Sequence, residues 1–377
     1  MKYLMLKDVC KISMGQSPNS SSYNDNGDGV PFFQGNADFG ERYPITRKWC
    51  NEPTKMANPK DILISVRAPI GAINYAKEEC CIGRGLAALT PDRNKVSPEY
   101  IYWLLKAKNE ELNSKGTGST FKAISRKVLE ETLVPDVDFD KQHEYAKILE
   151  KIYSVIQNRK KELVRFDDFI KARFVEMFGT LNNPSQEFTK ATLKELCNKI
   201  TDGKHGGCKV EEGTERYFVG AREIYDDEVH YDTAPEINVD EFEKDYKRCN
   251  IEIGDFLIVN TGATIGKSAI TTDERTEHTL LQKSVALLKV KKELLNPVFL
   301  KWCYRVNTQM YIVESASAQP NLLLSKINST VIYVPDMELQ NQFADFVTQV
   351  NKSKVAVQKA LDETKLLFDS LMQKYFG

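Results

Sequence analysis

Two long stretches of the chain carry apolar residues at a seven-residue spacing. The first stretch runs from Lys141 to Gly179 and the second from Gln340 to Gly377, and both end in Phe-Gly. In the second stretch two interleaved rows keep the spacing: Phe343, Val350, Val357, Thr364 and Leu371, and Val347, Lys354, Leu361, Phe368 and Tyr375. Interleaved rows of this kind are typical of the a and d positions of a coiled coil, so each stretch is predicted to be one long helix.

The first stretch has a similar seam, in which basic residues interrupt one of the rows. That row is Tyr145, Ile152, Arg159, Phe166 and Arg173, and the other is Leu149, Ile156, Leu163, Ile170 and Met177. At about 1.5 Å per residue, each helix would be about 60 Å long. A narrow seam of that length needs a partner helix, and the other stretch is available for that role. A core helix or an oligomerisation helix is the alternative for either stretch alone.

The similarity between the two stretches extends to the segments that precede them. Short motifs recur in the same order in both halves, at offsets from 187 (Leu6 to Leu193) to 200 (Ser125 to Ser325), as loop insertions would produce. The paired motifs are Leu6–Cys10 with Leu193–Cys197, Asp61–Ile64 with Asp255–Ile258, Ala68–Gly71 with Ala263–Gly266, Val134–Asp136 with Val334–Asp336, and Gln142 with Gln342. The chain is therefore predicted to be an internal repeat. A fused pseudodimer with a purely structural role would show the same duplication.

Each half before its long helix mixes short helical and strand-like segments. A helix opens each half, at Leu4–Ile12 and Thr192–Ile200, and a second helix begins at an x-Pro step, at Pro98–Leu112 and Pro297–Val313. The strand-like runs are Val30–Gln34, Asp61–Val66, Leu86–Leu89 and Thr132–Val134, then Tyr217–Val219, Asp255–Val259, Ser284–Val290 and Val331–Val334. This mixture predicts an α+β domain used twice. The predicted boundaries are domains at 1–137 and 181–336 and helices at 138–180 and 337–377, because Pro135 and Pro335 disfavour a helical residue before them.

Composition and charge narrow the class of protein. The 377 residues are 41% apolar and 28% charged, which predicts two or three globular domains. The net charge of −1 argues against an isolated DNA-binding protein but leaves local basic faces open. Eight cysteines without a C-x-x-C pair indicate neither a disulfide framework nor a zinc site, so we expect reduced thiols in the cytoplasm. No signal peptide and no membrane-spanning run are indicated.

No motif in the sequence predicts a catalytic or metal site. The loop Thr261–Ser268 resembles a phosphate-binding loop, but Thr261 stands where that motif needs a glycine four residues before Gly-Lys-Ser. We interpret it as a tight loop at the end of a strand. The four histidines, His143, His205, His230 and His278, show no metal-binding spacing. An enzyme that acts on nucleotides through this loop is kept as an alternative hypothesis.

Polar loops rich in Gly, Ser and basic residues are better suited to DNA. Arg and Lys can contact phosphates or guanine edges, whereas Asn and Gln can read adenine. The candidate DNA-binding residues are Gln16, Ser17, Arg67, Arg84, Thr117, Ser119, Thr120 and Lys122 in the first half, and Lys204, His205, Thr261, Thr264, Lys267, Gln319 and Asn321 in the second. Each could instead be an ordinary exposed loop residue, and Arg67 and Arg84 could form internal ion pairs.

The duplicated layout and several motifs together resemble the specificity subunits of type I restriction–modification systems. Each half opens with Leu-x-Asp/Glu-Val/Leu-Cys, and each long helix follows a Val-Pro step and ends in Phe-Gly. The longer motifs are DILISVRAPIG at Asp61–Gly71, GRGLAAL at Gly83–Leu89 and GTGSTFKAIS at Gly116–Ser125. The resemblance covers essentially the whole chain and recurs in both halves.

The resemblance implies two target recognition domains, each reading one half of a split DNA site. The two long helices would form an antiparallel coiled coil that spaces the domains and docks two methyltransferase subunits. Those partners would bind S-adenosylmethionine and methylate adenine at N6, and an endonuclease subunit that translocates DNA would complete the complex. The chain itself would be non-catalytic and hold no cofactor. A coiled-coil scaffold that does not bind DNA is the alternative.

The second half departs from the motifs of the first. It has Thr261 or Gly262 where the first half has the Arg of the Arg-Ala-Pro-Ile-Gly motif, and it lacks the Gly-Thr-Gly-Ser-Thr loop. We therefore expect the two domains to read different sequences. The sequence gives neither the DNA target nor the length of its spacer.

Overall fold

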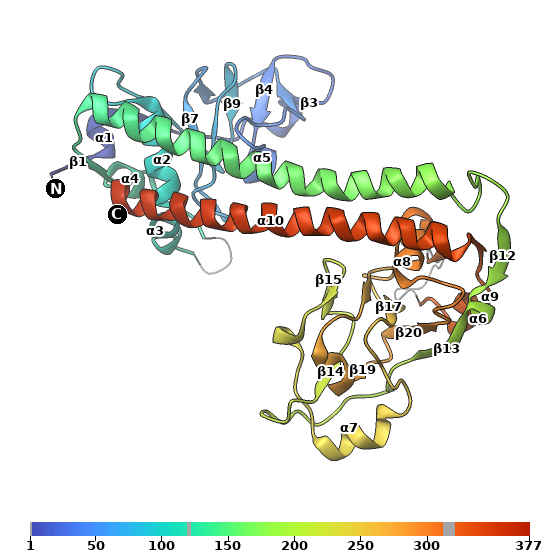
Figure 1. Cartoon of the computed structure of the whole chain (residues 1–377). Coiled ribbons are helices and arrows are strands. Elements are labelled where there is room, and N and C mark those ends of the chain that lie inside the picture. The colour runs from blue at the N-terminus through green and yellow to red at the C-terminus, as the bar shows by residue number, and fades with distance from the viewer. Residues whose placement is uncertain (1, 119–121, 312–320) are drawn as a thin grey trace. The chain divides into compact units, whose positions relative to one another are not determined.

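The computed structural model describes residues 2–118, 122–311 and 321–377 (Figure 1). The chain divides into two compact units, Met1–Lys160 with Lys359–Gly377, and Lys161–Gln358. Each unit contains one globular segment and parts of both long helices. The four-part division at 137, 180 and 336 stays a prediction. None of the helices in the described part of the chain combines the length and the apolarity that a membrane span requires.

The first unit is built around a sheet in the strand order β2-β10-β7-β8, which we call the first central sheet. All neighbours in it are antiparallel. A second sheet, β3-β5-β4-β9-β6, contains the parallel pair β4 and β9, and β1 pairs with β11. The strands are β1 (Tyr3–Met5), β2 (Cys10–Met14), β3 (Tyr23–Asn24), β4 (Val30–Phe33), β5 (Trp49–Cys50), β6 (Met56–Ala57), β7 (Ile62–Ser65), β8 (Ile73–Tyr75), β9 (Cys80–Ile82), β10 (Leu86–Pro91) and β11 (Leu133–Pro135). The helices are α1 (Leu6–Val9), α2 (Pro98–Ala107), α3 (Asn109–Ser114) and α4 (Arg126–Glu130), with 3₁₀ turns η1 (Ser20–Ser22) and η2 (Asn36–Asp38).

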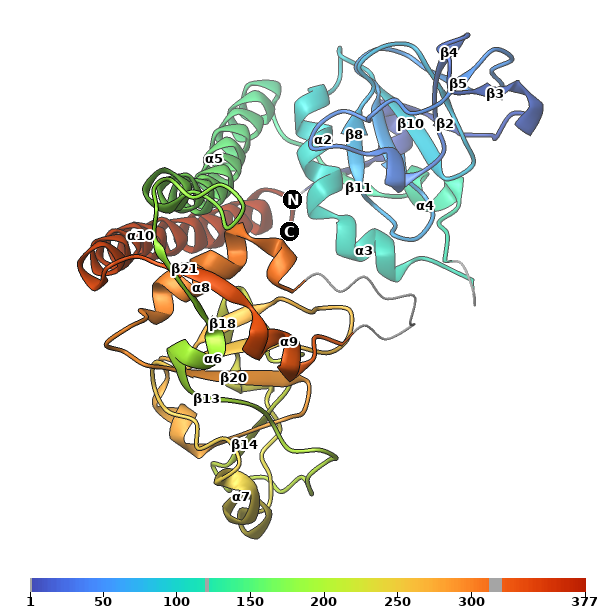
Figure 2. The same cartoon turned by 90° about the vertical axis from the view of Figure 1, so that its right-hand side faces the viewer.

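The second unit repeats the central sheet, the antiparallel pair and the parallel pair of the first, while its remaining strands form the separate pair β15 and β16. Its central sheet has the order β13-β20-β17-β18, β12 pairs with β21, and the parallel pair is β14 and β19. Figure 2 labels β13, β20 and β18 of this sheet. The strands are β12 (Thr189–Thr192), β13 (Cys197–Asp202), β14 (Tyr217–Val219), β15 (Ile224–Tyr225), β16 (Glu228–Val229), β17 (Phe256–Val259), β18 (Ser268–Ile270), β19 (Thr279–Leu281), β20 (Val285–Val290) and β21 (Val331–Val334). The helices are α6 (Leu193–Leu196), α7 (Val239–Tyr246), α8 (Pro297–Val306) and α9 (Leu324–Ser329), with 3₁₀ turns η3 (Tyr231–Thr233), η4 (Glu274–His278) and η5 (Thr308–Met310). The predicted α+β fold, repeated in the two halves, is confirmed.

The predicted opening helices were wrong in length. Only α1 and α6 are helical, and each lies between two strands that the sequence pattern did not show. The residues after α1 form β2 because Ile12 pairs with Leu89 of β10, the central strand of the sheet. Four helical residues hold too few backbone hydrogen bonds to outweigh that pairing. The second predicted helices are shorter as well, since α2 ends at Ala107 and α8 at Val306.

One buried helix in each unit packs on the central sheet. The helices α2 and α8 begin alike, with Ser97 or Asn296 as the cap and Pro as the first residue. On one side, Tyr102 of α2 stacks on Tyr75 of β8, and Tyr304 of α8 packs against Phe256 of β17. Both helices are therefore anchored to their sheets by aromatic rings.

A second side of α2 and α8 packs against the long helices. In the first unit Trp103 meets Tyr153 and Phe368 edge-on, and in the second Phe299 contacts Phe174 and Phe178. Each unit is thus layered as sheet, buried helix and helix pair. We use "helix pair" for the parts of the two long helices that belong to one unit.

The two long helices are α5 (Phe139–Phe178) and α10 (Met337–Phe376), as the heptad spacing predicted. In the first unit Tyr145 stacks on Tyr375 with ring centroids 3.9 Å apart, and Arg159 donates hydrogen bonds to the Ala360 carbonyl and Thr364. Because the partners on α10 move backwards as α5 advances, the helices run antiparallel there (Figure 1).

The helix pair of the second unit has the same antiparallel direction. Phe174 packs edge-on against Phe343, and the Lys354 ammonium lies 2.9 Å from the Asp167 carboxylate. Arg159, Lys354 and Thr364, three of the four polar residues of the predicted seam, are therefore used in contacts between the two helices. The antiparallel coiled coil that the family resemblance implied is confirmed.

One pairing of the repeat, Gln142 with Gln342, was wrong. The buried Gln142 accepts a hydrogen bond from the Ser97 N–H at 2.9 Å and donates to the Val137 carbonyl at 2.8 Å. In the second unit the buried Gln340 does the same with the Asn296 N–H and the Pro335 carbonyl, both at 2.8 Å, whereas Gln342 is exposed. The sequence offers both glutamines, and only burial distinguishes them.

We predict that Gln340→Leu lowers the free energy of unfolding by about 2–4 kcal/mol, because it leaves a partly buried N–H and a buried carbonyl without partners. Gln342→Leu is the matched control, and its effect should stay within about 0.5 kcal/mol because the side chain is exposed. Denaturant unfolding of the two variants and the wild type measures the difference. Equal stability of Gln340→Leu and the wild type would contradict this bracing role.

Candidate nucleic-acid interface

In the first unit, three loops meet at one end of the central sheet. Met14 lies opposite Ala87, and Ser65 lies opposite Leu86, so β2 and β7 end where β10 begins. We call this end of each central sheet its loop end. The central sheet of the second unit is arranged alike, because Asp202 and Val259 pair with the first residues of β20. A sheet end of this kind brings residues distant in sequence close together.

Backbone hydrogen bonds hold the first loop end together. The Gln16 N–H donates to the Ile82 carbonyl at 3.0 Å, and the Arg84 N–H donates to the Ser17 hydroxyl at 3.3 Å. The loop after β7 is tied in by Val66 N–H to Gly85 carbonyl (2.9 Å) and by Ala68 N–H to Lys122 carbonyl (3.0 Å). Ala123 forms bridges to Arg67 and Thr117. The predicted residues gathered here are Gln16, Ser17, Arg67, Arg84, Thr117 and Lys122, while Ser119 and Thr120 lie outside the described residues.

A glycine at the start of each loop allows this close approach. The Gly15 N–H bonds the Leu86 carbonyl, and the Gly203 N–H bonds the Val285 carbonyl. A side chain at either glycine would collide with backbone carbonyl oxygens, those of Gly83 and Leu281 respectively. Only glycine therefore lets the loop pass so close to the neighbouring strand.

The cations of the first loop end carry unbalanced charge. Arg67, Arg84 and Lys122 are exposed, and none of them forms an ion pair with another described residue. The alternative that Arg67 and Arg84 form internal ion pairs therefore has no support in the described part of the chain. Three uncompensated positive charges at one edge attract polyanions such as the phosphates of DNA.

The second loop end is built from the corresponding segments. The Lys204 N–H donates to the Leu281 carbonyl at 2.7 Å, as Gln16 does to Ile82, and the Asn260 N–H donates to the Ser284 carbonyl at 3.0 Å. Thr261 bridges to Asn321, as Arg67 does to Ala123. The predicted residues gathered here are Lys204, His205, Thr261, Thr264, Lys267 and Asn321, and Gln319 lies outside the described residues. Their contact with DNA stays a prediction in both units.

The charge of Lys204 is already compensated within the second unit. Its ammonium lies 2.7 Å from the Asp245 carboxylate and 3.3 Å from the Glu241 carboxylate, both on α7. The side chain is only 18% exposed, and the hydrogen bond to Asp245 raises the pKa of Lys204. His205 is also paired, with Asp202 at 3.3 Å. Sequence reasoning could not foresee this, because α7 lies about 40 residues further along the chain.

Two exposed basic residues at the second loop end were missed by sequence reasoning. Lys283 occupies the position of Arg84, since Gln282 N–H bonds the Val219 carbonyl as Gly83 N–H bonds the Phe33 carbonyl. Extending the repeat from Gly83–Leu89 to the second half would have found it. Arg222 follows Ala221, whose N–H donates to the Ser284 hydroxyl at 3.2 Å. No sequence motif marks Arg222, because only the parallel pair β14 and β19 brings it to this edge.

The geometry of the loop Thr261–Ser268 is not that of a phosphate-binding loop. It joins β17 to the antiparallel β18, with Ile258 opposite Ser268, whereas a phosphate-binding loop leads from a strand into a helix. The interpretation as a tight loop is confirmed, because the Gly266 N–H returns to the Val259 carbonyl at 3.0 Å. The nucleotide hypothesis therefore loses the one motif on which it depended.

Other reactive groups in the described residues are buried or scattered. Burial raises the pKa of Cys10, Cys80 and Cys197 to about 12, so these thiols stay protonated at neutral pH and are poor nucleophiles. Within the described ranges no three His, Cys, Asp or Glu side chains gather as a set of metal ligands. The loop ends are therefore the sites at which chemistry-bearing side chains converge.

Comparison with known proteins places this arrangement in a family. The family model for the type I restriction modification DNA specificity domain matches residues 1–165 and 185–364, and so covers both halves. The chain belongs to this family. The family resemblance predicted from the sequence is thus confirmed.

Relatives of this chain carry the same description. The putative type I restriction enzyme MjaX specificity subunit of Methanocaldococcus jannaschii is 44% identical over 152 residues, which are 40% of this chain and 36% of that protein. The EcoBI specificity subunit of Escherichia coli is 21% identical over 99% of this chain and 85% of its own length. The type I system S subunit from M. genitalium shares the fold, with a TM-score of 0.58, 16% identity, and coverage of 100% of this chain and 96% of that one.

Proposed function

We propose that the chain is the DNA-specificity subunit of a type I restriction–modification complex and that each loop end reads one half of a split DNA site. The observation that carries the proposal is a cation at the same position of both loop ends. Arg84 and Lys283 stand at equivalent positions, and both are exposed and without an ion-pair partner among the described residues. Family membership supports the same role. A scaffold that does not bind DNA would have no use for uncompensated cations at the same position of both loop ends.

The two loop ends present different side chains on the same backbone. Gln16 corresponds to Lys204, Arg67 to Thr261 and Arg84 to Lys283. Because donors and acceptors on base edges are matched by side-chain type, domains that differ in this way recognise different bases. We therefore propose that the two half-sites have different sequences.

We further propose the partners that the chain needs for activity. Methyltransferase subunits would bind S-adenosylmethionine and methylate adenine at N6, and an endonuclease subunit would complete the complex, in the cytoplasm. The chain itself would contribute recognition and no catalytic group. Relatives described as specificity subunits of restriction enzymes support this assignment.

The first experiment is to sequence DNA from cells that express this chain with and without a neighbouring methyltransferase gene, detecting modified bases on single molecules. We expect a split motif with N6-methyladenine in both halves, present only when both genes are expressed. A soluble complex of the two proteins that leaves no methylated motif would favour a scaffold instead.

The proposal predicts how loop-end charges affect binding. Arg84→Ala and Lys283→Ala should each weaken DNA binding by the complex, and each should reduce the slope of log affinity against log salt by about 1, since each removes one phosphate contact. Binding is measured by titration at several salt concentrations.

Matched controls stand at the other end of the same strands. Arg84 and Arg93 flank β10, and Lys283 and Lys292 flank β20, and all four are exposed. Arg93→Ala and Lys292→Ala should leave the salt slope unchanged. Equal effects of the two members of either pair would show that general charge, and not the loop end, governs binding.

We also predict that the long helices set the gap between the half-sites. Removing one heptad from α5 and the facing heptad from α10 keeps the seam in register and shortens the pair by about 10 Å, at about 1.5 Å per residue. The gap in the methylated motif should then shrink by about three base pairs, at about 3.4 Å each, with both half-sites retained. An unchanged gap in the methylation map of this variant would rule out the spacer role.

A further inference from the structure

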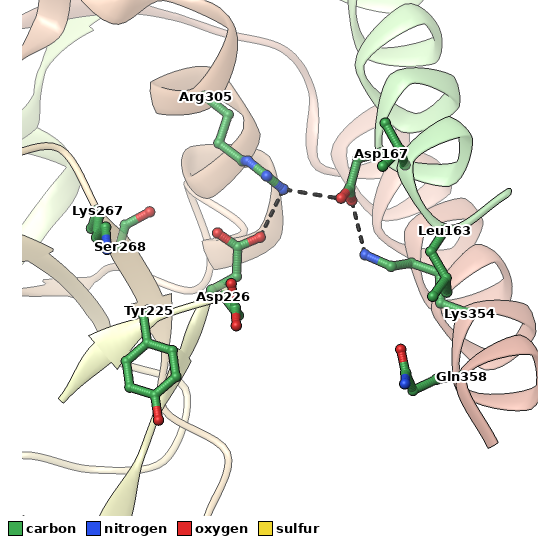
Figure 3. Close-up of a pocket in the computed structure, with 11 residues that line it drawn as sticks. Leu163, Asp167, Tyr225, Asp226, Lys267, Ser268, Arg305, Lys354 and Gln358 are labelled. Atoms are coloured by element: carbon green, nitrogen blue, oxygen red, sulfur yellow. Dashed lines mark hydrogen bonds and ion pairs between the residues drawn. The ribbon is translucent and has the colours of Figure 1, made fainter. Parts of the chain in front are cut away.

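A charged cleft of about 520 Å³ lies within the second unit, beside β18 (Figure 3). Its walls come from the tip of the β15–β16 hairpin, from α8 and from the helix pair of this unit. Three acidic and three basic side chains line it: Asp167, Asp226, Asp227, Lys267, Arg305 and Lys354. These charges balance, and the ion pairs among them join the hairpin tip to α8 and the helix pair.

Asp227 at the hairpin tip is the centre of this contact. Its carboxylate lies 2.7 Å from the Arg305 guanidinium and 3.4 Å from the Lys301 ammonium, and both cations belong to α8. Lys301 is only 16% exposed, and burial lowers the pKa of Lys301 while Asp227 opposes that shift. Arg305 also reaches Asp167 at 3.9 Å, and Asp167 pairs with Lys354 (Figure 3). The tip is thus linked to the helix pair through α8.

The backbone at the tip is left-handed at two consecutive residues. Asp226 and Asp227 have φ of 50° and 66° and connect Tyr225 to its partner Glu228. Two-residue turns with both residues in this region favour Gly, Asn and Asp. Residues held in such conformations persist where surrounding contacts fix them, and the ion pairs of Asp227 are such contacts.

The root of the same hairpin lies at the second loop end. Arg222 stands just before β15, between Ala221, which bonds Ser284, and Glu223, which accepts the Gly220 N–H at 2.8 Å. Between root and tip the segment is stiff, because Tyr225 and His230 stack with centroids 3.4 Å apart and the His230 N–H returns to the Glu223 carbonyl at 2.8 Å. A shift of the tip would therefore be transmitted to Arg222.

We propose that Asp227 is a positioning residue, whose ion pairs with Lys301 and Arg305 place Arg222 for contact with the half-site read by the second domain. This inference rests on the proposed function. The first unit has an analogous contact: after β4, the turn closed by the bridge between Phe39 and Pro44 carries Arg42, which forms an ion pair with Glu150 of α5. Asp227, Lys301 and Arg305 all belong to the second unit, so this anchor concerns the half-site read by the second domain.

The test replaces Asp227 with Asn in the full chain, in complex with the methyltransferase subunits. Asparagine tolerates the left-handed turn, so the variant loses the charge and keeps the backbone. We measure methylation rates on DNA with the split motif and on DNA with single base-pair changes in either half. Discrimination against changes in the half-site read by the second domain should fall about tenfold, the size of one good base contact, and discrimination in the other half should not change.

Two further variants separate positioning from stability. Asp226→Asn changes the neighbouring turn residue, which has no ion pair among the described residues, and should behave as wild type. Asp227→Asn loses stability because Lys301 is left buried and unpaired. In the double variant Asp227→Asn with Lys301→Met, thermal stability should recover toward wild type while discrimination at the second half-site stays low.

Three outcomes would overturn the inference. The first is wild-type discrimination by Asp227→Asn at both half-sites. The second is an equal loss at both half-sites. The third is recovery of discrimination together with stability in the double variant, which would make Asp227 merely structural. Failure of the wild-type complex to methylate any split motif would instead count against the proposed function itself.

Discussion

Each unit depends on one buried helix that packs against both the central sheet and the helix pair. The helix α2 buries every residue from Tyr100 to Leu105, so it has no polar face over that stretch. Its rings contact the central sheet on one side and the helix pair on the other, and α8 does the same in the second unit. Because protein interiors are close-packed, a helix held on both sides fixes the sheet relative to the helix pair of its unit. This packing therefore sets the positions of the loop ends and of the cations that anchor Asp227.

The parts of the structure that sequence reasoning predicted are those set by local pattern. The heptad spacing gave both long helices to within a few residues, and the motif repeat gave two similar α+β segments. The errors came where tertiary contacts decide: strand pairing shortened the opening helices, and burial selected Gln340 over Gln342. At the candidate site, residues near strand ends were brought together as expected. The pairing of Lys204 with Asp245 and the position of Arg222 at the second loop end depend on contacts between segments distant in sequence. The sequence alone therefore could not show them.

At the two loop ends, Arg84 and Lys283 combine a fixed backbone with a free side chain. Each lies in a three-residue link between a strand of the parallel pair and the central sheet, and the residues on either side are hydrogen-bonded at 2.8–3.0 Å. The side chain itself is exposed and does not contribute to the core. Substitutions at such positions change stability little. The two domains can therefore diverge in what they contact while keeping one fold, which is what a duplicated reader of two different sequences requires.

The polar contacts between the two long helices show that the helices have diverged since their duplication. The bracing glutamines, Gln142 and Gln340, are 198 positions apart, and so are the closing Phe178 and Phe376. By that offset Lys354, the partner of Asp167, corresponds to Ile156. A pairing between two copies of the first helix would thus set the Asp167 carboxylate against an isoleucine and lose this ion pair. The ancestral symmetry survives in the fold, but the two helices have become complementary halves that are no longer interchangeable.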